Sequence, residues 1–320
     1  MDKSSQDKYI DRSESVFGLD RRLFTILDTD SDHPRFPRAP SRFKTSRKRI
    51  RKITYTMRLR WWNLRTGRLL TRILGRQFTR TREKIEIDLT YECNLKCNDC
   101  NRSCKQAVDT NEIEFQSIVD FIDQSIDRGI SWKKIRLLGG EPTLHSHFEE
   151  ILYELARYKI EYPRCRLEVV TNGYGRRVNR VLLRVPPFFH IENTSKKSSH
   201  QPFFYSFNLA PIDDLKWANA DFTNGCSNIE DCGIGLTPTG YYPCAIAGGI
   251  DRVAGWEVGR SSIPSDDDDM LDLLSKFCGH CGRFPSRKFT PPDLQEENTP
   301  GQISPVWNEL YEEWNRMVAE

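Results

Sequence analysis

No run of about 18 consecutive apolar residues occurs in the 320-residue chain, so we expect no membrane-spanning helix. The opening residues, 1–7, contain no apolar core, so we expect no secretion signal. No internal repeat is found. Ten cysteines in a 37.4 kDa chain without such a signal are typical of a cytoplasmic protein that uses its thiols for metal rather than for disulfides.

Acidic residues are nearly absent from one segment. Residues 42–84 contain 16 Lys and Arg and a single acid, whereas the net charge of the whole chain is only +3. The apolar residues there roughly follow helical spacing: Trp61, Leu64, Leu69, Ile73 and Leu74. The segment is predicted to form a basic amphipathic helical arm over 42–82. Four surroundings stay open for it: the chain's own acidic core, an anionic membrane surface, nucleic acid or an acidic partner.

Three cysteines lie close together at Cys93, Cys97 and Cys100, in the run YECNLKCNDC. Iron–sulfur clusters are usually held by four Cys thiolates. Three thiolates leave one iron of a four-iron cube without a protein ligand, and such an iron can bind a small molecule and pass it an electron. A structural zinc site fits the same local spacing, with Cys104 as the nearby fourth thiol. The cysteines alone leave both metals open.

Strand and helix patterns alternate after the basic segment. Residues 84–89 alternate with period two, and residues 133–138 and 167–170 form buried apolar runs. Helical stripes lie between these strands: Ile118, Phe121, Ile122, Ser125 and Ile126, then Phe148, Ile151, Leu152 and Leu155. Weaker strands are predicted at 188–192 and 205–209. The alternation predicts a parallel sheet with helical crossovers.

The second strand runs into Gly139, Gly140, Glu141 and Pro142, 39 residues after Cys100. A C-x3-C-x2-C segment followed by Gly-Gly-Glu-Pro in this context resembles the radical S-adenosylmethionine (SAM) superfamily. The resemblance implies an α/β fold, a partial and open parallel β/α barrel. It also implies a 4Fe-4S cluster on the three cysteines that binds SAM. The activity it implies is reductive cleavage of SAM to a 5′-deoxyadenosyl radical, with an electron donor such as flavodoxin or ferredoxin.

The resemblance also suggests which residues contact SAM: Gly139, Gly140, Glu141, Pro142 and Asn172. In such folds ligands collect at the carboxyl ends of the strands. One departure concerns the residue before the third cysteine, which is usually aromatic in the family and lies near the adenine. This chain has Asp99 there. Tyr91 is the candidate substitute for the adenine contact.

A second cysteine group follows near the C-terminus. Residues 236–244 are predicted to form a hairpin with a Pro-Thr-Gly turn. Together with a C-x2-C knuckle, this resembles the SPASM and twitch extensions of radical SAM enzymes, although three residues rather than four separate Gly240 from its cysteine. The resemblance implies one auxiliary 4Fe-4S cluster, on Cys226, Cys244, Cys278 and Cys281, with Cys232 as a rival first ligand. A structural zinc knuckle on the same thiols is the alternative.

Several other residues suggest ordinary structural roles. Cys165 is isolated and is predicted to be a buried core thiol. His145 and His147 are typical of a hydrogen-bonding pair in a loop, and His280 is a weaker ligand candidate than its cysteine neighbours. The acidic run 266–269 is predicted to be a solvated loop or helix start.

The predicted organisation has five parts: a disordered polar tail (1–41), the basic arm (42–82), a radical SAM core (83–222), an auxiliary-cluster domain (223–290) and a C-terminal loop with a docking helix (291–320). The predicted function is hydrogen abstraction from an unidentified substrate. A peptide or protein side chain is preferred, with dehydrogenation of a small molecule as the other class. The rival function is a non-catalytic zinc or iron–sulfur protein that contacts RNA through residues 42–84.

Overall fold

The computed structural model describes residues 45–196, 199, 207–284 and 302–319, with side chains from residue 53 onward. Its centre is a six-stranded sheet with the order β4-β3-β2-β1-β5-β6. Neighbouring strands are parallel except for β5 and β6, which form an antiparallel hairpin at one edge. The strands are β1 (Lys84–Thr90), β2 (Lys134–Gly139), β3 (Arg166–Thr171), β4 (Phe189–Asn193), β5 (Ile234–Thr237) and β6 (Gly240–Tyr242). The sheet is open, as predicted for a partial α/β barrel.

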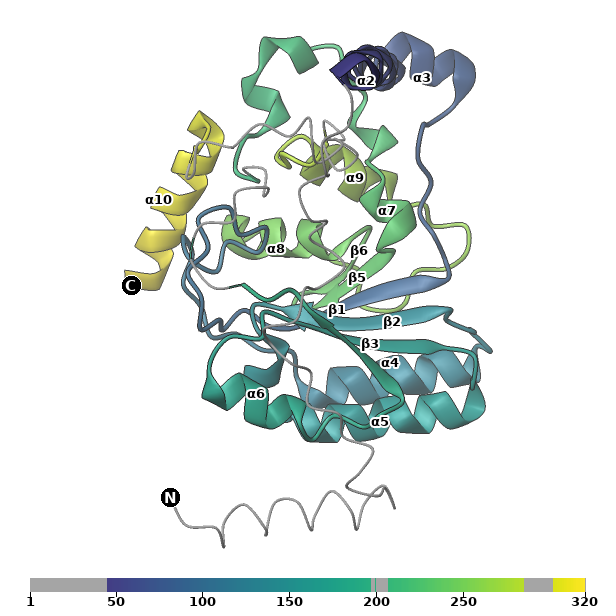
Figure 1. Cartoon of the computed structure of the whole chain (residues 1–320), viewed down its shortest axis with the longest axis vertical. Helices are drawn as coiled ribbons and strands as arrows, with labels where there is room; N and C mark the ends of the chain where they lie inside the picture. Colours follow the sequence, from purple (N-terminus) through teal and green to yellow (C-terminus); the bar gives the residue numbers. More distant parts are fainter. Residues whose placement is uncertain (1–44, 197–198, 200–206, 285–301, 320) are drawn as a thin grey trace, which may run out of the picture.

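Helices cover both sides of this sheet (Figure 1). The α-helices are α2 (Thr45–Arg65), α3 (Arg68–Leu74), α4 (Phe115–Asp127), α5 (Phe148–Glu161), α6 (Arg176–Leu182), α7 (Asn228–Asp231), α8 (Ala245–Ala254), α9 (Leu271–Cys278) and α10 (Pro305–Ala319). Single 3-10 turns are η2 (Pro142–Leu144), η3 (Pro211–Asp213), η4 (Leu215–Trp217) and η5 (Phe222–Asn224). In Figure 1, α4, α5 and α6 lie on one face, α8 on the other, and α2 and α3 at the far end of the molecule.

The strands predicted at 84–89, 133–138, 167–170 and 188–192 are confirmed as β1 to β4, and the two predicted helical stripes are confirmed as α4 and α5. The apolar stripes of α4 and α5 are buried against the sheet. One strand prediction fails: the described part of 205–209, residues 207–209, is turn and coil rather than strand, and 205–206 lie outside the described residues. The fifth parallel strand is instead β5, from the predicted C-terminal hairpin, which pairs with β1. The sheet therefore continues across the predicted domain boundary at residue 222.

The two faces of the sheet differ in chemistry because side chains alternate along each strand. Ile85, Ile87 and Leu89 of β1 point to the apolar core. Glu86 and Asp88 point to the opposite face and are buried as well. A buried charged face needs partners, and these come from the neighbouring strands and from the cysteine loop.

Polar contacts attach the basic arm to the body of the molecule. Asp269 receives a 2.6 Å ion pair from Arg76, and Arg82 also pairs with the acidic run. The guanidinium of Arg80 donates to the carbonyl oxygens of Ser265 and Asp268, at 3.2 and 2.7 Å. The acidic run is thus the partner of the arm rather than a purely solvated loop.

The apolar side chains of the arm behave differently. All five that the sequence placed on its apolar face are exposed: Trp61, Leu64, Leu69, Ile73 and Leu74. The arm is therefore fixed to the chain's own acidic segment through its arginines, while these five apolar side chains do not pack on the core that the structure describes.

The predicted C-terminal helix is confirmed as α10, which buries Trp307, Leu310 and Tyr311. Cys165 is a buried core thiol, as expected. The tail predicted over 1–41 lies outside the described residues, as do 285–301. The division of the chain into domains stays a prediction.

Candidate functional site

Two glycines bring the end of β2 into close contact with the start of the cysteine loop. A Cβ atom at Gly139 would lie 2.4 Å from the Thr90 oxygen, and one at Gly140 would lie 2.3 Å from the Glu92 oxygen. The absence of side chains lets the backbones bond: the Gly140 N–H donates to Thr90 at 2.7 Å, and the Glu141 N–H donates to Glu92 at 2.9 Å. The Gly-Gly-Glu-Pro segment is therefore joined directly to the residues preceding Cys93.

The Glu141 carboxylate connects the ends of β2 and β3 and is fully buried. One oxygen accepts hydrogen bonds from the Thr143 and Thr171 hydroxyls, each at 2.8 Å, and the other accepts from the Asn172 N–H at 2.8 Å. Burial raises the pKa of Glu141 even though these donors favour the charged form. Its side chain is thus committed to the scaffold, which leaves the backbone of the segment as the part that can face a ligand.

Cys93, Cys97 and Cys100 lie in a loop without regular structure, just beyond the carboxyl end of β1. Cys93 and Cys97 each interact electrostatically with Cys100, and Lys196 acts on all three thiols. Burial raises the pKa of Cys93 to about 11 and also raises that of Cys97. The three thiols of this loop are therefore close enough to interact electrostatically with the same lysine, Lys196.

Cys104 supports this set from the protein side. A hydrogen bond from the Cys104 thiol, with a smaller effect of Lys196, lowers the pKa of Cys100 to about 5. Cys104 itself is buried. Since thiolates are the metal-binding form, its thiol favours the ligand state of its neighbour.

Asn172 lies beside the cysteine loop at the carboxyl end of β3. Its amide nitrogen is 3.8 Å from the Cys93 sulfur and donates to the Asn94 side-chain oxygen at 2.8 Å. The structure thus brings together Cys93, the Gly-Gly-Glu-Pro segment and Asn172, at the ends of three adjacent parallel strands. This is the edge at which ligands bind in open α/β sheets.

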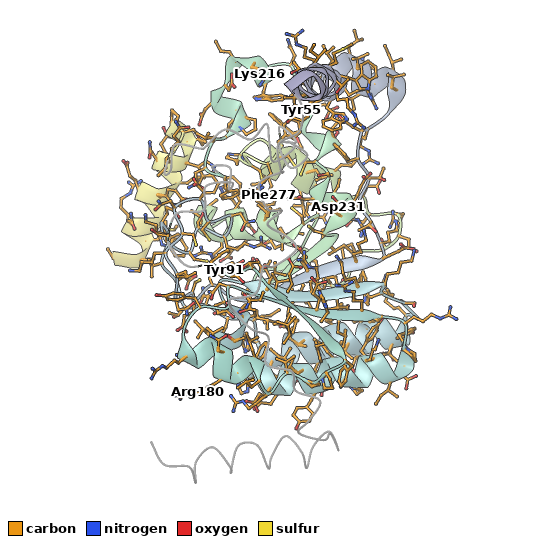
Figure 2. The ribbon with its side chains drawn as sticks, viewed as in Figure 1. Tyr55, Tyr91, Arg180, Lys216, Asp231 and Phe277 are labelled. Atoms are coloured by element: carbon orange, nitrogen blue, oxygen red, sulfur yellow. The ribbon has the colours of Figure 1, made fainter. Side chains whose placement is uncertain are left out.

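Tyr91 does not replace the missing aromatic residue at position 99. Its ring is 1 % exposed and lies under the guanidinium of Arg252, whose carbon is 4.3 Å from the ring centroid. Tyr91 is labelled in Figure 2. The expectation that Tyr91 faces the adenine is therefore wrong. Asp99 is buried too.

The face of the sheet that carries Glu86 and Asp88 holds a network of charged side chains that was not predicted from the sequence. Arg136 of β2 pairs with Glu86 and with Glu192, the latter at 2.9 Å. Arg102, from the cysteine loop, donates two 3.1 Å hydrogen bonds to Asp88. Burial alone would raise the pKa of Glu86, but Arg136 and Arg102 hold it below its usual value. The sequence does carry a signal for this network: the period-two pattern of residues 84–89 places Glu86 and Asp88 on the same face of the strand.

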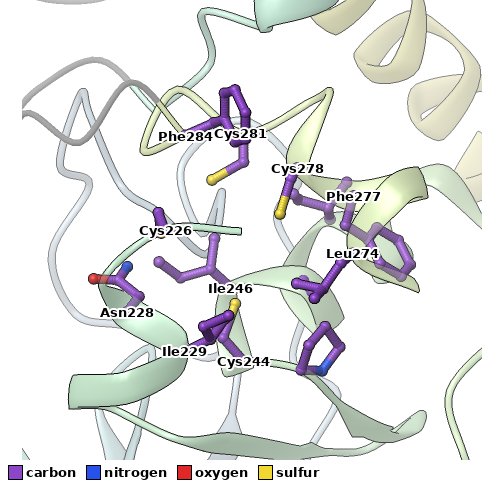
Figure 3. A pocket seen from close by; sticks show the side chains of 13 residues that line it. Cys226, Asn228, Ile229, Cys244, Ile246, Leu274, Phe277, Cys278, Cys281 and Phe284 are labelled. Carbon is purple, nitrogen blue, oxygen red and sulfur yellow. The ribbon is translucent and has the colours of Figure 1, made fainter. Parts of the chain in front are cut away.

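The second cysteine group meets around a small cavity (Figure 3). Its volume is about 20 Å³, and its other lining side chains are mostly apolar. The four thiols that line it are those predicted from the resemblance: Cys226, Cys244, Cys278 and Cys281. Across the described residues, no three His, Cys, Asp or Glu side chains converge tightly enough to hold a single metal ion. The thiols surround a space rather than meeting at a point.

Each of these cysteines comes from a different structural position. Cys226 follows η5, Cys244 precedes the first residue of α8, Cys278 ends α9 and Cys281 lies just beyond it. Burial raises the pKa of Cys244 and of Cys281 to about 12 and that of Cys278 well above its usual value. Soft thiolate donors in apolar surroundings suit an iron–sulfur cluster or zinc.

The rival ligands lie elsewhere. Cys232 is within hydrogen-bonding reach of Glu86, on the charged face of the sheet, and does not line the cavity. His280 binds the Lys276 carbonyl oxygen through Nδ1 at 2.8 Å. His145 binds the Ile113 carbonyl oxygen, and its Nδ1 accepts from the His147 N–H. The two histidines form the expected loop pair.

No helix in the described part of the chain has the length and apolar character to cross a membrane. Residues 87–189 match the model of the Radical SAM superfamily. A GTP 3',8-cyclase of Helicobacter pylori is 31 % identical over 99 residues, 30 % of this chain and 29 % of that protein. A GTP 3',8-cyclase of Paenarthrobacter nicotinovorans is 27 % identical over 151 residues, 45 % of this chain and 40 % of that protein. The chain thus spans well under two thirds of the curated relatives it matches.

Among solved structures, BtrN in complex with AdoMet and 2-DOIA aligns with a TM-score of 0.40 and 14 % identity. The alignment covers 71 % of this chain and all of that one. A TM-score of this size carries no argument about shape or activity.

Proposed function

We propose that this chain, whose residues 87–189 match the model of the Radical SAM superfamily, is an enzyme that cleaves SAM reductively and abstracts hydrogen from an organic substrate. The observation that carries the proposal is the backbone junction between the cysteine loop and Gly140–Glu141. It holds the three-cysteine loop against the segment expected to bind SAM. The family implies a 4Fe-4S cluster, which supplies the electron when bound together with SAM.

The residues of the chain would position these groups. Cys93, Cys97 and Cys100 are the proposed cluster ligands, and the Asn172 amide lies beside the Cys93 sulfur. Gly139, Gly140, Glu141 and Pro142 would offer SAM their backbone, because the Glu141 side chain is occupied within the protein. Binding at the strand ends would keep the reacting groups close to the charged inner face of the sheet.

For the second cysteine group we propose an auxiliary 4Fe-4S cluster on Cys226, Cys244, Cys278 and Cys281. Support comes from the four thiols lining one mostly apolar cavity that Cys232 does not line. Four ligands would leave no open iron, which favours electron transfer over substrate binding. Zinc on the same thiols is the alternative.

The substrate class stays open between a peptide or protein side chain, which we test first, and a small molecule that is dehydrogenated. The GTP 3',8-cyclases share too little of their length with the chain for GTP to be proposed from their names. The electron donor is proposed to be a flavodoxin or ferredoxin.

The decisive experiment measures 5′-deoxyadenosine released from SAM by the anaerobically reconstituted, dithionite-reduced chain. Cys97→Ala should abolish the product, because the cluster loses a ligand. Cys165→Ala is the matched control, since Cys165 is also a buried thiol but belongs to the core. Product from the control but not from Cys97→Ala supports the proposal.

Two results would overturn the proposal. One is release of 5′-deoxyadenosine that Cys97→Ala leaves unchanged. The other is a chain that binds zinc stoichiometrically, contains no sulfide and does not cleave SAM, which is the result expected of the non-catalytic alternative.

A further inference from the structure

Helix α2 has two apolar faces, and only one of them turns toward the protein. Tyr55, Leu59 and Trp62 are half-buried on the inner side, and Figure 2 shows Tyr55 on the side of α2 toward the body. Residues four, four and three apart form a separate stripe on the outer side: Ile53, Met57, Trp61 and Leu64. These four side chains are 53 to 65 % exposed. These four side chains therefore do not hold α2 to the part of the molecule that the structure describes.

Helix α3 also exposes apolar side chains. Leu69, Ile73 and Leu74 are 54 to 70 % exposed, while Thr71 turns inward and accepts a 2.6 Å hydrogen bond from Asn224. Arm and body are also joined by the Arg68 N–H, which donates to the Asn219 carbonyl oxygen at 3.0 Å. The two helices thus form a fixed platform at one end of the molecule, on the far side from α4 and α5 (Figure 1). We call the seven exposed apolar residues of α2 and α3 the outer stripe.

The charged residues of the segment that carries the outer stripe are all cationic. Residues 53–82 contain eight arginines and no acid. Arg76, Arg80 and Arg82 bind the acidic segment 265–269 through ion pairs and hydrogen bonds. Arg58, Arg60, Arg68 and Arg72 are exposed on the two helices, and on a helical projection Arg60 and Arg58 lie on opposite sides of the stripe. The binding partner that best complements exposed apolar side chains flanked by arginines has an apolar interior and an anionic surface.

We propose that the outer stripe docks the protein on an anionic membrane surface. The side chains of Met57, Trp61 and Leu64 would enter the boundary between headgroups and acyl chains, and the flanking arginines would contact anionic headgroups. A bilayer accepts a convex apolar ridge without a preformed groove. Two other occupants fit less well. Aliphatic side chains add nothing to contacts with nucleic-acid phosphates, and a symmetric dimer through the stripe would bring like-charged arginines together.

The test is sedimentation of the full-length chain with vesicles of phosphatidylcholine alone or of phosphatidylcholine and phosphatidylglycerol in equal parts. We expect binding to the anionic vesicles only, and weaker binding at high salt. Trp61→Ser combined with Leu64→Ser should lower the partition coefficient about tenfold or more. Arg60→Gln and Arg72→Gln should each lower it about fivefold.

The matched control removes exposed apolar side chains from the other side of the sheet. Ile160→Ser combined with Leu183→Ser acts on residues that are 76 and 43 % exposed at the ends of α5 and α6. This variant should bind anionic vesicles like the parent chain, and circular dichroism should show all variants folded.

Three outcomes would overturn the proposal. The first is the absence of binding to the anionic vesicles, or binding that the stripe and control variants retain equally. The second is RNA binding, seen as a gel shift, that depends on the arginines but not on Trp61 and Leu64, without vesicle binding. The third is a dimer in solution that Leu64→Ser dissociates. Because binding is measured without SAM, the result is independent of the proposed radical chemistry.

Discussion

The two cysteine groups use the same ligand atom in contrasting surroundings. Cys93, Cys97 and Cys100 lie on one short loop next to polar groups, among them Lys196 and Asn172. The second group is gathered from separate positions around a mostly apolar cavity. Burial raises the pKa of Cys244 to about 12 and that of Cys93 to about 11, so the groups differ in the residues around their thiols rather than in the effect of burial. The contrast fits an open reactive site in the first group and a closed site in the second.

The site around Cys93, Cys97 and Cys100 depends on the backbone contact between Gly140 and the cysteine loop. We therefore expect the largest loss of activity from a substitution of this glycine. In Gly140→Ala the new Cβ would lie 2.3 Å from the Glu92 carbonyl oxygen, so the cysteine loop must move. Because displacement of reacting groups by about 1 Å can cost about 100-fold in rate, we expect 5′-deoxyadenosine formation to fall by about that factor. The rate is measured with reconstituted protein.

Gly249→Ala is the control for that substitution. A Cβ atom there would meet its nearest neighbour, the Arg102 Cα, at an ordinary 3.5 Å. Its rate should stay near that of the parent chain. Equal rates for both variants would mean that the junction does not position the site.

The Glu141 carboxylate gives a smaller test of the same scaffold. Glu141→Gln removes an acceptor from buried donors at Thr143, Thr171 and Asn172. We expect a loss of about 2 kcal/mol in the free energy of unfolding, since buried donors are left unpaired. Anaerobic urea unfolding measures it.

Glu112→Gln is the matched carboxylate, because Glu112 also accepts from a backbone N–H and a hydroxyl, both of Ser146, but is more exposed. Glu112→Gln should lower the free energy of unfolding by no more than about 0.5 kcal/mol. A loss at Glu112 as large as that at Glu141 would contradict the structural role assigned to Glu141.

The second site is tested by metal content. With two cubes the chain should hold about eight irons, and Cys278→Ala about four, at four irons per cluster. SAM cleavage without substrate should persist, because the first site is separate. Iron and sulfide analysis decides the point. Cys232→Ala should keep all eight irons, and equal iron in Cys278→Ala and Cys232→Ala would make the ligand assignment wrong.

Local patterns predicted much of the fold. The strands at 84–89, 133–138 and 167–170 and helices α4 and α5 follow from periodicity, because each element buries one face on the same core. The weaker strand predicted at 205–209 covers Tyr-Ser-Phe-Asn-Leu, and so short a segment does not distinguish a strand from a buried turn. Phe207 is indeed buried, but in a turn.

At the candidate sites the prediction was accurate where residues are adjacent in sequence and weaker where distant segments meet. The hairpin of β5 and β6 was recognised, yet its place beside β1 in the main sheet was not. Tyr91 was expected near the adenine, because nothing in the sequence indicates that Arg252 covers it. The apolar residues of the arm were identified, but spacing alone does not tell an inner face from an outer one.

The sequence by itself determined the two cysteine groups, the Gly-Gly-Glu-Pro segment and the alternation that produces a parallel sheet, because these depend on neighbouring residues and on periodicity. Only the tertiary structure decided that Cys226 rather than Cys232 lines the second cavity, that Arg102 pairs with Asp88, and that the outer stripe of the arm faces away from the core. The physical reason is that each of these outcomes is a contact, or the lack of one, between segments far apart in the chain. Such contacts are set by how the sheet and helices pack together.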